Sequence, residues 1–197
     1  EEWDTFSQAV GLCSNKSSVT KPQAFTNTDE TKYAYMTDSN RESILITIGV
    51  GKDTVAEETF RENQPRTKFY GADPITEFNE DLYSKFGLFF PFAIGNETKK
   101  STASVLIAGS FSLEGAEFGI FKMFHRKGDF DKNLIVVCQI NIETHLSKPD
   151  DKGTFMSFAE KLVNEGRYIV VESLTAVHNR LFFVNVESNY CREIFNV

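Results

Sequence analysis

The sequence has few of the residues that mark several large classes of protein. Of its 197 residues only three are cysteine, five are proline and one is tryptophan. The cysteines lack the spacing of metal ligands, and no apolar run reaches the length of a membrane-spanning helix. A chain of this length buries a core without metal or disulfide support. We therefore expect a globular domain without a structural metal, and no membrane span in this chain.

Positive charge is also scarce. The chain has 21 Lys and Arg against 28 Asp and Glu, which gives a formal net charge of −7. Nucleic acids and anionic membranes bind clustered basic residues, so neither is expected as a partner. No signal peptide is visible, and because the chain begins with Glu1 rather than Met we expect a trimmed or processed product. The sequence does not predict an oligomeric state.

The cysteines and two glycosylation tripeptides bear on location. Cys138 lies in an apolar run and is expected to be a small buried residue, whereas a bridge between Cys13 and Cys191 would tie the two termini. The Asn-X-Ser/Thr tripeptides at Asn15 and Asn96 fit a secretory protein. They favour the secretory lumen or the extracellular space slightly over the cytoplasm.

The stretch over 44–74 has the most informative pattern. It predicts an apolar strand over 44–48, a turn that contains Gly49 and Gly51, a helix over 54–62, and a strand over 68–71 that is followed by Asp73. Glycine lets the backbone approach a ligand, and the helix that follows offers unpaired N–H groups. A carboxylate past the second strand can accept hydrogen bonds from ribose hydroxyls. Two interpretations are open: a nucleoside-binding unit or an ordinary turn between strand and helix.

Further elements are expected along the rest of the chain: helices over 76–86, 118–125 and 154–164, and strands over 88–94, 134–142, 168–172 and 181–186. Phe78, Leu82 and Phe86 predict one buried helix face. The apolar run over 134–142 predicts a central strand buried on both faces. Alternating strands and helices favour a mostly parallel sheet with helices on both faces, which closes here on an antiparallel hairpin.

We expect a division into an N-terminal extension over 1–40 and a main domain over 41–197. In the extension, an apolar spacing from Trp3 to Leu12 fits either a short helix or a loosely held segment. In a parallel sheet, ligands bind outside the carboxyl ends of the strands. The residues that follow the predicted strands are therefore the candidates for a site, and they are Gly49, Gly51, Asp73, Ala93, Glu114, Glu143 and His145.

With these residues assembled, the chain resembles the FkbM family of S-adenosylmethionine-dependent methyltransferases, and most of all its nematode branch. The resemblance covers about 44–187. It rests on five segments, which read ITIGVGKD, YGADP, FFPFAIG, LEGAEFGIF and CQINIETH. The family fold is the Rossmann-like sheet of class I methyltransferases, which has seven strands and an antiparallel last strand. That arrangement agrees with the predicted hairpin.

The resemblance implies methyl transfer from S-adenosylmethionine to a hydroxyl of a small molecule, sugar or lipid. Gly49 and Gly51 would approach the methionine and ribose end of the cofactor, and Asp73 would hold the ribose hydroxyls. Ile75 and Ala93, with Ile94, would border the adenine. His145 or Glu143 would remove the acceptor proton, and Glu114 is a third candidate for a catalytic residue. A hydrogen-bonded structural role is the alternative for each histidine.

Three departures from the family pattern favour other functions. Ser112 replaces an acid, and Thr47 replaces the acid before the glycines. Only 108–111 separates two segments that the family places further apart, so either one strand–helix unit is missing or the apolar run over 104–107 takes the role of the fourth strand. These changes favour a catalytically silent protein of the same fold, acting as a secreted or luminal interaction module. A dinucleotide-dependent oxidoreductase is disfavoured, since Asp53 or Thr54 stands near the position of the third glycine.

Overall fold

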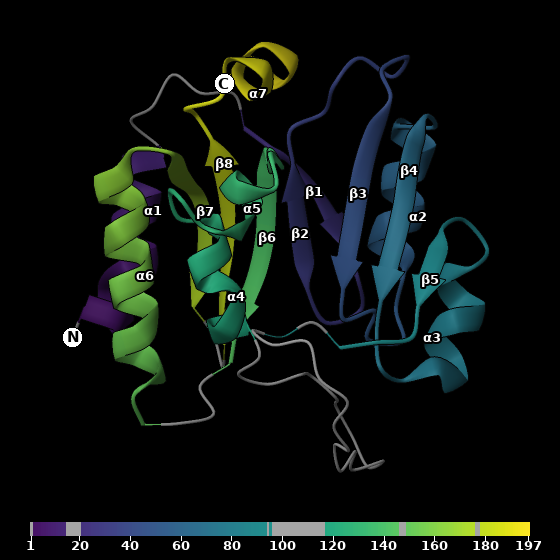
Figure 1. Cartoon of the computed structure of the whole chain (residues 1–197), viewed down its shortest axis with the longest axis horizontal. Coiled ribbons are helices and arrows are strands. Elements are labelled where there is room, and N and C mark those ends of the chain that lie inside the picture. The colour runs from purple at the N-terminus through teal and green to yellow at the C-terminus, as the bar shows by residue number, and fades with distance from the viewer. Residues whose placement is uncertain (1, 15–20, 94, 96–116, 146–148, 176–177) are drawn as a thin grey trace. The chain divides into compact units, whose positions relative to one another are not determined.

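A computed structural model of the chain describes residues 2–14, 21–93, 95, 117–145, 149–175 and 178–197 (Figure 1). The chain divides into two compact units, one of residues 23–32 and 36–113 and the other of residues 1–22, 33–35 and 114–197. We refer to them as the parallel unit and the antiparallel unit after their sheets. The chain is thus mixed α/β, with a three-stranded parallel sheet and a C-terminal antiparallel sheet.

The parallel unit contains the βαβ pattern read from the sequence. Its sheet has the order β3-β4-β5, and both strand pairs are parallel. Its elements are β1 (Gln23–Thr26), β3 (Ser43–Ile48), α2 (Val55–Asn63), β4 (Thr67–Ala72), α3 (Thr76–Tyr83) and β5 (Leu88–Phe90). β1 forms a separate two-stranded sheet with β2 (Thr31–Ala34). The strands and helix predicted over 44–71 are therefore confirmed, while β1 and β2 were not predicted.

One face of the parallel sheet carries the core of this unit. Buried Val50, Phe69 and Tyr83 form the cluster, and partly buried Phe60 and Phe86 pack against it. Tyr83 is fully buried, so the inward face of α3 is centred on it rather than on Phe78, which is 51% exposed. The predicted stripe of Phe78, Leu82 and Phe86 was therefore wrong at its first residue.

The opposite face of the parallel sheet is largely apolar and exposed. Side chains alternate between the two faces of a strand, and the exposed set along β3 and β5 consists of Ile44, Ile46, Ile48, Leu88 and Phe90. The prediction of helices on both faces is not met within the described part of this unit. β5 also ends at Phe90 rather than continuing to residue 94, because Pro91 has no N–H for the ladder.

Close packing requires a glycine at position 71. A Cβ added to Gly71 would lie 2.7–2.8 Å from three atoms of the Tyr83 ring. Gly71→Ala should therefore lower the free energy of unfolding by about 1–3 kcal/mol, the range for overpacked cores. Urea unfolding measures this, with Gly95→Ala as the control, because a Cβ at Gly95 meets nothing within 4 Å. Equal effects of the two substitutions would contradict the packing assigned to Tyr83.

The antiparallel unit contains the second sheet, of order β6-β8-β7, in which β8 runs antiparallel to both neighbours. The antiparallel hairpin predicted for the last two strands is therefore confirmed. The elements of this unit are α1 (Glu2–Ser14), α4 (Glu117–Phe124), α5 (Asp129–Lys132), β6 (Gln139–Thr144), α6 (Asp151–Glu165), β7 (Tyr168–Thr175), β8 (Asn179–Asn185) and α7 (Asn189–Phe195). Of the two alternatives for the start of the chain, the helix is the one found.

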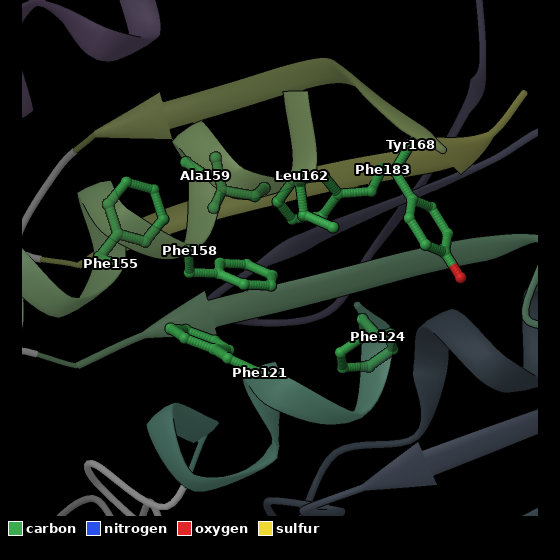
Figure 2. Close-up of a cluster of buried hydrophobic side chains, with 9 residues drawn as sticks. Phe121, Phe124, Phe155, Phe158, Ala159, Leu162, Tyr168 and Phe183 are labelled. Atoms are coloured by element: carbon green, nitrogen blue, oxygen red, sulfur yellow. The ribbon is translucent and has the colours of Figure 1, made fainter. Parts of the chain in front are cut away.

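Both faces of β8 are buried. Leu181 and Phe183 point to one face, where α4 and α6 complete a cluster rich in phenylalanine (Figure 2). In this cluster the rings of Phe121 and Phe158 stack with centroids 4.0 Å apart. Phe182 and Val184 point to the other face, where Tyr35 packs against them. The central strand of this unit is therefore β8.

The run over 134–142 was predicted as that central strand, and this prediction was wrong in its first half. The short helix α5 ends in a tight turn in which Leu134 has φ 56° and its N–H donates to Asp131 O. Leu134 is 91% exposed and Val136 is 58% exposed. The chain enters the sheet only at Gln139, because the turn after α5 carries the preceding apolar residues outside it.

A disulfide joins Cys138, which directly precedes β6, to Cys191 on α7. The Cα atoms lie 5.4 Å apart, within the range that a disulfide spans. The suggested Cys13–Cys191 bridge was therefore wrong, as was the prediction that Cys138 is an unpaired buried residue. Cys13 is exposed and carries a free thiol. None of the helices in the described part of the chain has the length and apolar character needed to cross a bilayer.

Candidate functional site

The turn after β3 adopts the conformation that its glycines allow. Gly49 has φ 77°, Gly51 has φ 65° and Lys52 has φ 63°, all in the left-handed region that favours glycine. A Cβ on Gly49 or Gly51 would meet nothing within 4 Å. The glycines are therefore required by the backbone conformation, and the space beside them is open.

Two polar side chains hold this turn in place. Asp73, directly after β4, accepts a hydrogen bond from the N–H of Val50 at 2.9 Å, and its other oxygen accepts from the N–H of Ile75 at 2.7 Å. Buried Asn79 of α3 accepts from the N–H of Lys52 at 2.9 Å. Asp73 thus faces the glycine turn, as expected for a site at this edge of the sheet. Asn79 was not among the predicted residues.

The first N–H groups of α2 are occupied by side chains of the same unit. Asp53 accepts from the N–H of Val55 at 3.0 Å, and Asn27 accepts from the N–H of Ala56 at 2.7 Å. Burial by itself would raise the pKa of Asp53, but hydrogen bonds from the N–H groups of Val55 and Thr28 outweigh it and lower that pKa. The expectation that these N–H groups are unpaired was therefore wrong. The carboxylate of Asp53 and the amide of Asn27 already accept hydrogen bonds from them.

Three buried polar side chains and the partly exposed Lys32 form a chain of hydrogen bonds next to the turn. Tyr83 donates to the hydroxyl of Thr47 at 3.0 Å, Thr47 donates to Glu57 at 3.0 Å, and Glu57 pairs with Lys32 at 2.8 Å. Burial alone would lower the pKa of Lys32, but the carboxylates of Glu57 and Glu30 outweigh it and raise that pKa. The side chain of Thr47 is thereby held in the interior of this unit.

The buried phenol of Tyr83 predicts a loss of stability at alkaline pH. Burial raises its pKa from 10.0 to about 12, so the group contributes fully below pH 10 and its contribution is lost as the pH rises to about 12. Over that interval the free energy of unfolding should fall by about 1.4 kcal/mol per pH unit for this one proton. Urea unfolding at several pH values measures the slope.

Tyr83→Phe should remove the part of the decrease in the free energy of unfolding between pH 10 and about pH 12 that is due to this phenol. Tyr168, whose pKa burial also raises to about 12, should leave a residual slope in the antiparallel unit. An unchanged pH dependence in the Tyr83→Phe protein would contradict this assignment.

The remaining residues predicted for the cofactor lie at the same end of the parallel sheet. Ile75 is half-buried and precedes α3, and Ala93 is exposed three residues after β5. The N–H of Asp73 donates to Phe90 O at 3.2 Å, so the ends of β4 and β5 are joined there. A hollow of about 410 Å³ lies where Lys52 of the turn meets Glu77, Phe78, Asp81 and Leu82 of α3.

The second group of predicted residues lies at the end of β6 in the antiparallel unit. Nδ1 of His145 lies 3.3 Å from Oε1 of Glu117, the first residue of α4, and the same oxygen accepts from the backbone N–H of His145 at 2.5 Å. Nε2 of His145 lies 3.8 Å from Oε2 of Glu143. Arg180 donates to the other oxygen of Glu143 at 2.9 Å. Glu117 was not predicted to belong to a site.

His178 completes this group. Thr144 pairs with Asn179 at the end of the β6–β8 ladder, so the next residues outward are His145 and His178. Their ring centroids are 4.3 Å apart. The carboxylate of Glu143 and the two imidazoles offer three ligand atoms that all lie within 4.8 Å of one another. We refer to Glu143, His145 and His178 as the His-Glu cluster.

Several predicted features lie outside the described residues: Glu114, Ile94, Ser112, the run over 104–107 and the link over 108–111. Glu114 thus remains a prediction, as does the missing strand–helix unit, and the boundary at residue 40 likewise stays a prediction.

In comparisons with known proteins, the chain matches no protein-family model, no curated protein and no solved structure.

Proposed function

We propose that the parallel unit binds S-adenosylmethionine and that the chain transfers its methyl group to a hydroxyl of a small molecule, sugar or lipid. The observation that carries the proposal is the hydrogen bond from the N–H of Val50, between the two glycines, to Asp73. The carboxylate and the open side of the glycine turn therefore meet at one edge of the sheet. A carboxylate has about four acceptor positions, and two of them are used by the N–H groups of Val50 and Ile75. We propose that a ribose hydroxyl donates to a remaining position of Asp73, whose side chain is 6% exposed.

The charge at this edge favours a nucleoside without phosphates. A dinucleotide places its pyrophosphate on the N–H groups at the start of the helix. Here Asp53 and Asn27 occupy those N–H groups, and the Asp53 carboxylate would repel a phosphate. S-adenosylmethionine has no phosphate and carries a positive sulfonium. The contacts therefore favour it over the nicotinamide cofactors of an oxidoreductase.

The order of the strands adds support for a Rossmann-like methyltransferase fold. Three consecutive parallel strands with two intervening helices make up one unit. In the other unit the last strand, β8, runs antiparallel between β6 and β7, as in the family that the sequence resembles.

For the transfer step, we propose that His145 or Glu143 accepts the proton of the attacking hydroxyl. An ionised Glu117 can only accept hydrogen bonds, so its contact with Nδ1 of His145 places the ring proton there and leaves the lone pair on Nε2. A neutral imidazole with this tautomer is a suitable general base. His145→Ala should lower turnover and leave cofactor affinity unchanged, whereas unchanged turnover would remove His145 from the mechanism.

Isothermal titration calorimetry with S-adenosylmethionine and S-adenosylhomocysteine tests the cofactor site. We expect micromolar binding of both and no binding of NAD⁺. Asp73→Ala should weaken binding at least tenfold, since a hydrogen bond to a charged group contributes about 1.5–3 kcal/mol. Asp73→Asn keeps the shape of the side chain and removes its charge, so its affinity shows how much of the loss is due to the charge.

Glu80→Gln is the matched control, because it removes one exposed negative charge from α3. It should leave the affinity unchanged. Tight binding of NAD⁺, or full affinity in a folded Asp73→Ala protein, would contradict the proposal.

The contact of Thr47 with Glu57 favours a second candidate, a catalytically silent protein of this fold that acts as a secreted or luminal interaction module. Disulfides persist in secreted proteins and in the secretory lumen, and are rare in the cytosol. The Cys138–Cys191 bond therefore supports a secretory or extracellular location for either candidate. The commitment of Thr47 to Glu57 supports the silent form in particular, because that side chain contacts the interior. The calorimetric titration separates the two candidates.

A further inference from the structure

We infer that the His-Glu cluster binds a divalent transition-metal ion of the zinc type. Two imidazoles and one carboxylate are a donor set that suits Zn²⁺ and similar ions, whereas Mg²⁺ and Ca²⁺ prefer oxygen ligands only. The inference concerns the antiparallel unit alone and does not rest on methyl transfer. An ion bound to Nε2 of His145 and to Glu143 would replace the proton-acceptor role proposed for these two residues, so the two proposals are alternatives for this cluster.

The spacing of the cluster fits such an ion. Ligand atoms about 2.1 Å from a tetrahedral ion lie roughly 3.4 Å from one another. In the chain the three ligand atoms lie within 4.8 Å of one another, and Nε2 of His145 is 3.8 Å from Oε2 of Glu143. Small rotations of the side chains bring them onto one ion. The paired strands hold the backbone of all three residues, since the ladder ends at Thr144 and Asn179.

Glu117 orients the histidine as an outer carboxylate does in many metal sites. Metal-binding histidines usually donate their other ring N–H to a carboxylate or carbonyl, which fixes the tautomer. Oε1 of Glu117 lies 3.3 Å from Nδ1 of His145 and also accepts the backbone N–H of that residue. Nε2 is thereby turned with its lone pair toward Glu143. A lone pair and a carboxylate repel each other unless a cation or a proton lies between them.

His178 distinguishes a metal ion from a proton in that position. A doubly protonated His145 could donate hydrogen bonds to both Glu117 and Glu143, but it would leave Nδ1 of His178 without a partner. Nδ1 of His178 is buried and has no hydrogen-bond partner among the described residues. A buried polar atom without a partner costs free energy, and a bond to a metal ion would recover that cost. Among the described residues, the carboxylate of Glu117 contacts the cluster beside that of Glu143, and Glu143 accepts a hydrogen bond from the guanidinium of Arg180.

The test is titration of the full, tag-free chain, first treated with a chelator, with Zn²⁺ by calorimetry and with Co²⁺ by visible absorption. We expect one ion per chain, a cobalt spectrum of low coordination number and no binding of Mg²⁺. His145→Ala, His178→Ala and Glu143→Gln should each weaken Zn²⁺ binding at least tenfold. Glu117→Gln should weaken it about 10–100-fold, as expected for an outer carboxylate.

His125→Gln changes the third histidine, which lies outside the cluster, and Glu193→Gln removes a carboxylate from α7. Both controls should bind Zn²⁺ like the unmodified chain, and circular dichroism checks that each variant is folded. A folded chain that binds neither Zn²⁺ nor Co²⁺ would overturn the inference. Undiminished binding in a folded His178→Ala protein would also overturn it, because the ion would then lie elsewhere.

Discussion

Removing the Cys138–Cys191 disulfide is expected to lower the free energy of unfolding of the antiparallel unit by about 4 kcal/mol. The two cysteines are 53 residues apart, and closing a loop of that length in the unfolded chain contributes about 4 kcal/mol in the chain-entropy model. The bond also joins α7 to the start of β6, and Cys191 is fully buried. Urea unfolding of a Cys138→Ala/Cys191→Ala protein, followed by circular dichroism, measures the loss.

Cys13→Ala is the matched control for this prediction. Its thiol is exposed and free, so the change should stay within about 0.5 kcal/mol, as for most surface substitutions. Treatment of the unmodified chain with a reducing agent should reproduce the effect of the double substitution. If reduction leaves the unfolding midpoint unchanged, the disulfide does not stabilise this unit.

Phe155→Ala should cost about 3–5 kcal/mol, the range for truncating a buried phenylalanine. Phe155 is fully buried on α6, where its ring meets that of Phe6 edge-on at a centroid distance of 5.4 Å. It belongs to the cluster drawn in Figure 2, in which α4 and α6 cover one face of the sheet. Truncation would leave a cavity between α1 and α6.

Val163→Ala on the same helix is the control, because Val163 is 62% exposed. It should change the free energy of unfolding by less than about 0.5 kcal/mol. The comparison also tests the assignment of the helix faces, since comparable losses at Phe155 and Val163 would mean that α6 is rotated relative to the sheet.

The elements that could be predicted from the sequence are those with a clear local signal. The apolar run over 44–48 identified β3, and the helix predicted over 154–164 is α6, which ends at Gly166 with φ 63°. α7 was missed although a signal was present: Ser188 precedes it and accepts from the N–H of Cys191. A short helix with a serine N-cap is easily overlooked beside longer apolar runs.

The errors have a common cause, which is that tertiary pairing overrode local pattern. Leu134 and Val136 have the β-branched or apolar character of a strand, yet the turn after α5 carries them to the surface. Which cysteine pairs with Cys191 depends on the position of α7 in the fold, and the spacing of the cysteines along the sequence does not define that position. In the same way His178 could be placed beside His145 only through the register of β6 and β8. Their separation along the chain gives no metal-ligand spacing.

Part of the candidate cofactor site could be predicted from the sequence. The glycine turn and Asp73 were found from the βαβ pattern, because the carboxyl ends of parallel strands meet at one edge. Their contact through Val50 agrees with that expectation. The roles of Asn79 and Asn27 were not predictable, since each side chain reaches a backbone N–H in a distant segment.

The most direct measurement of the central claim is an NMR titration of the ¹⁵N-labelled chain with S-adenosylhomocysteine. If the cofactor binds at the edge formed by the glycine turn and Asp73, the largest amide shifts will fall on Gly49, Val50, Gly51 and Ile75. In the Asp73→Ala protein the same shifts will require at least tenfold more ligand. Saturating ligand that leaves these four amides unmoved in a folded chain, or that shifts only amides of the antiparallel unit, would contradict the account.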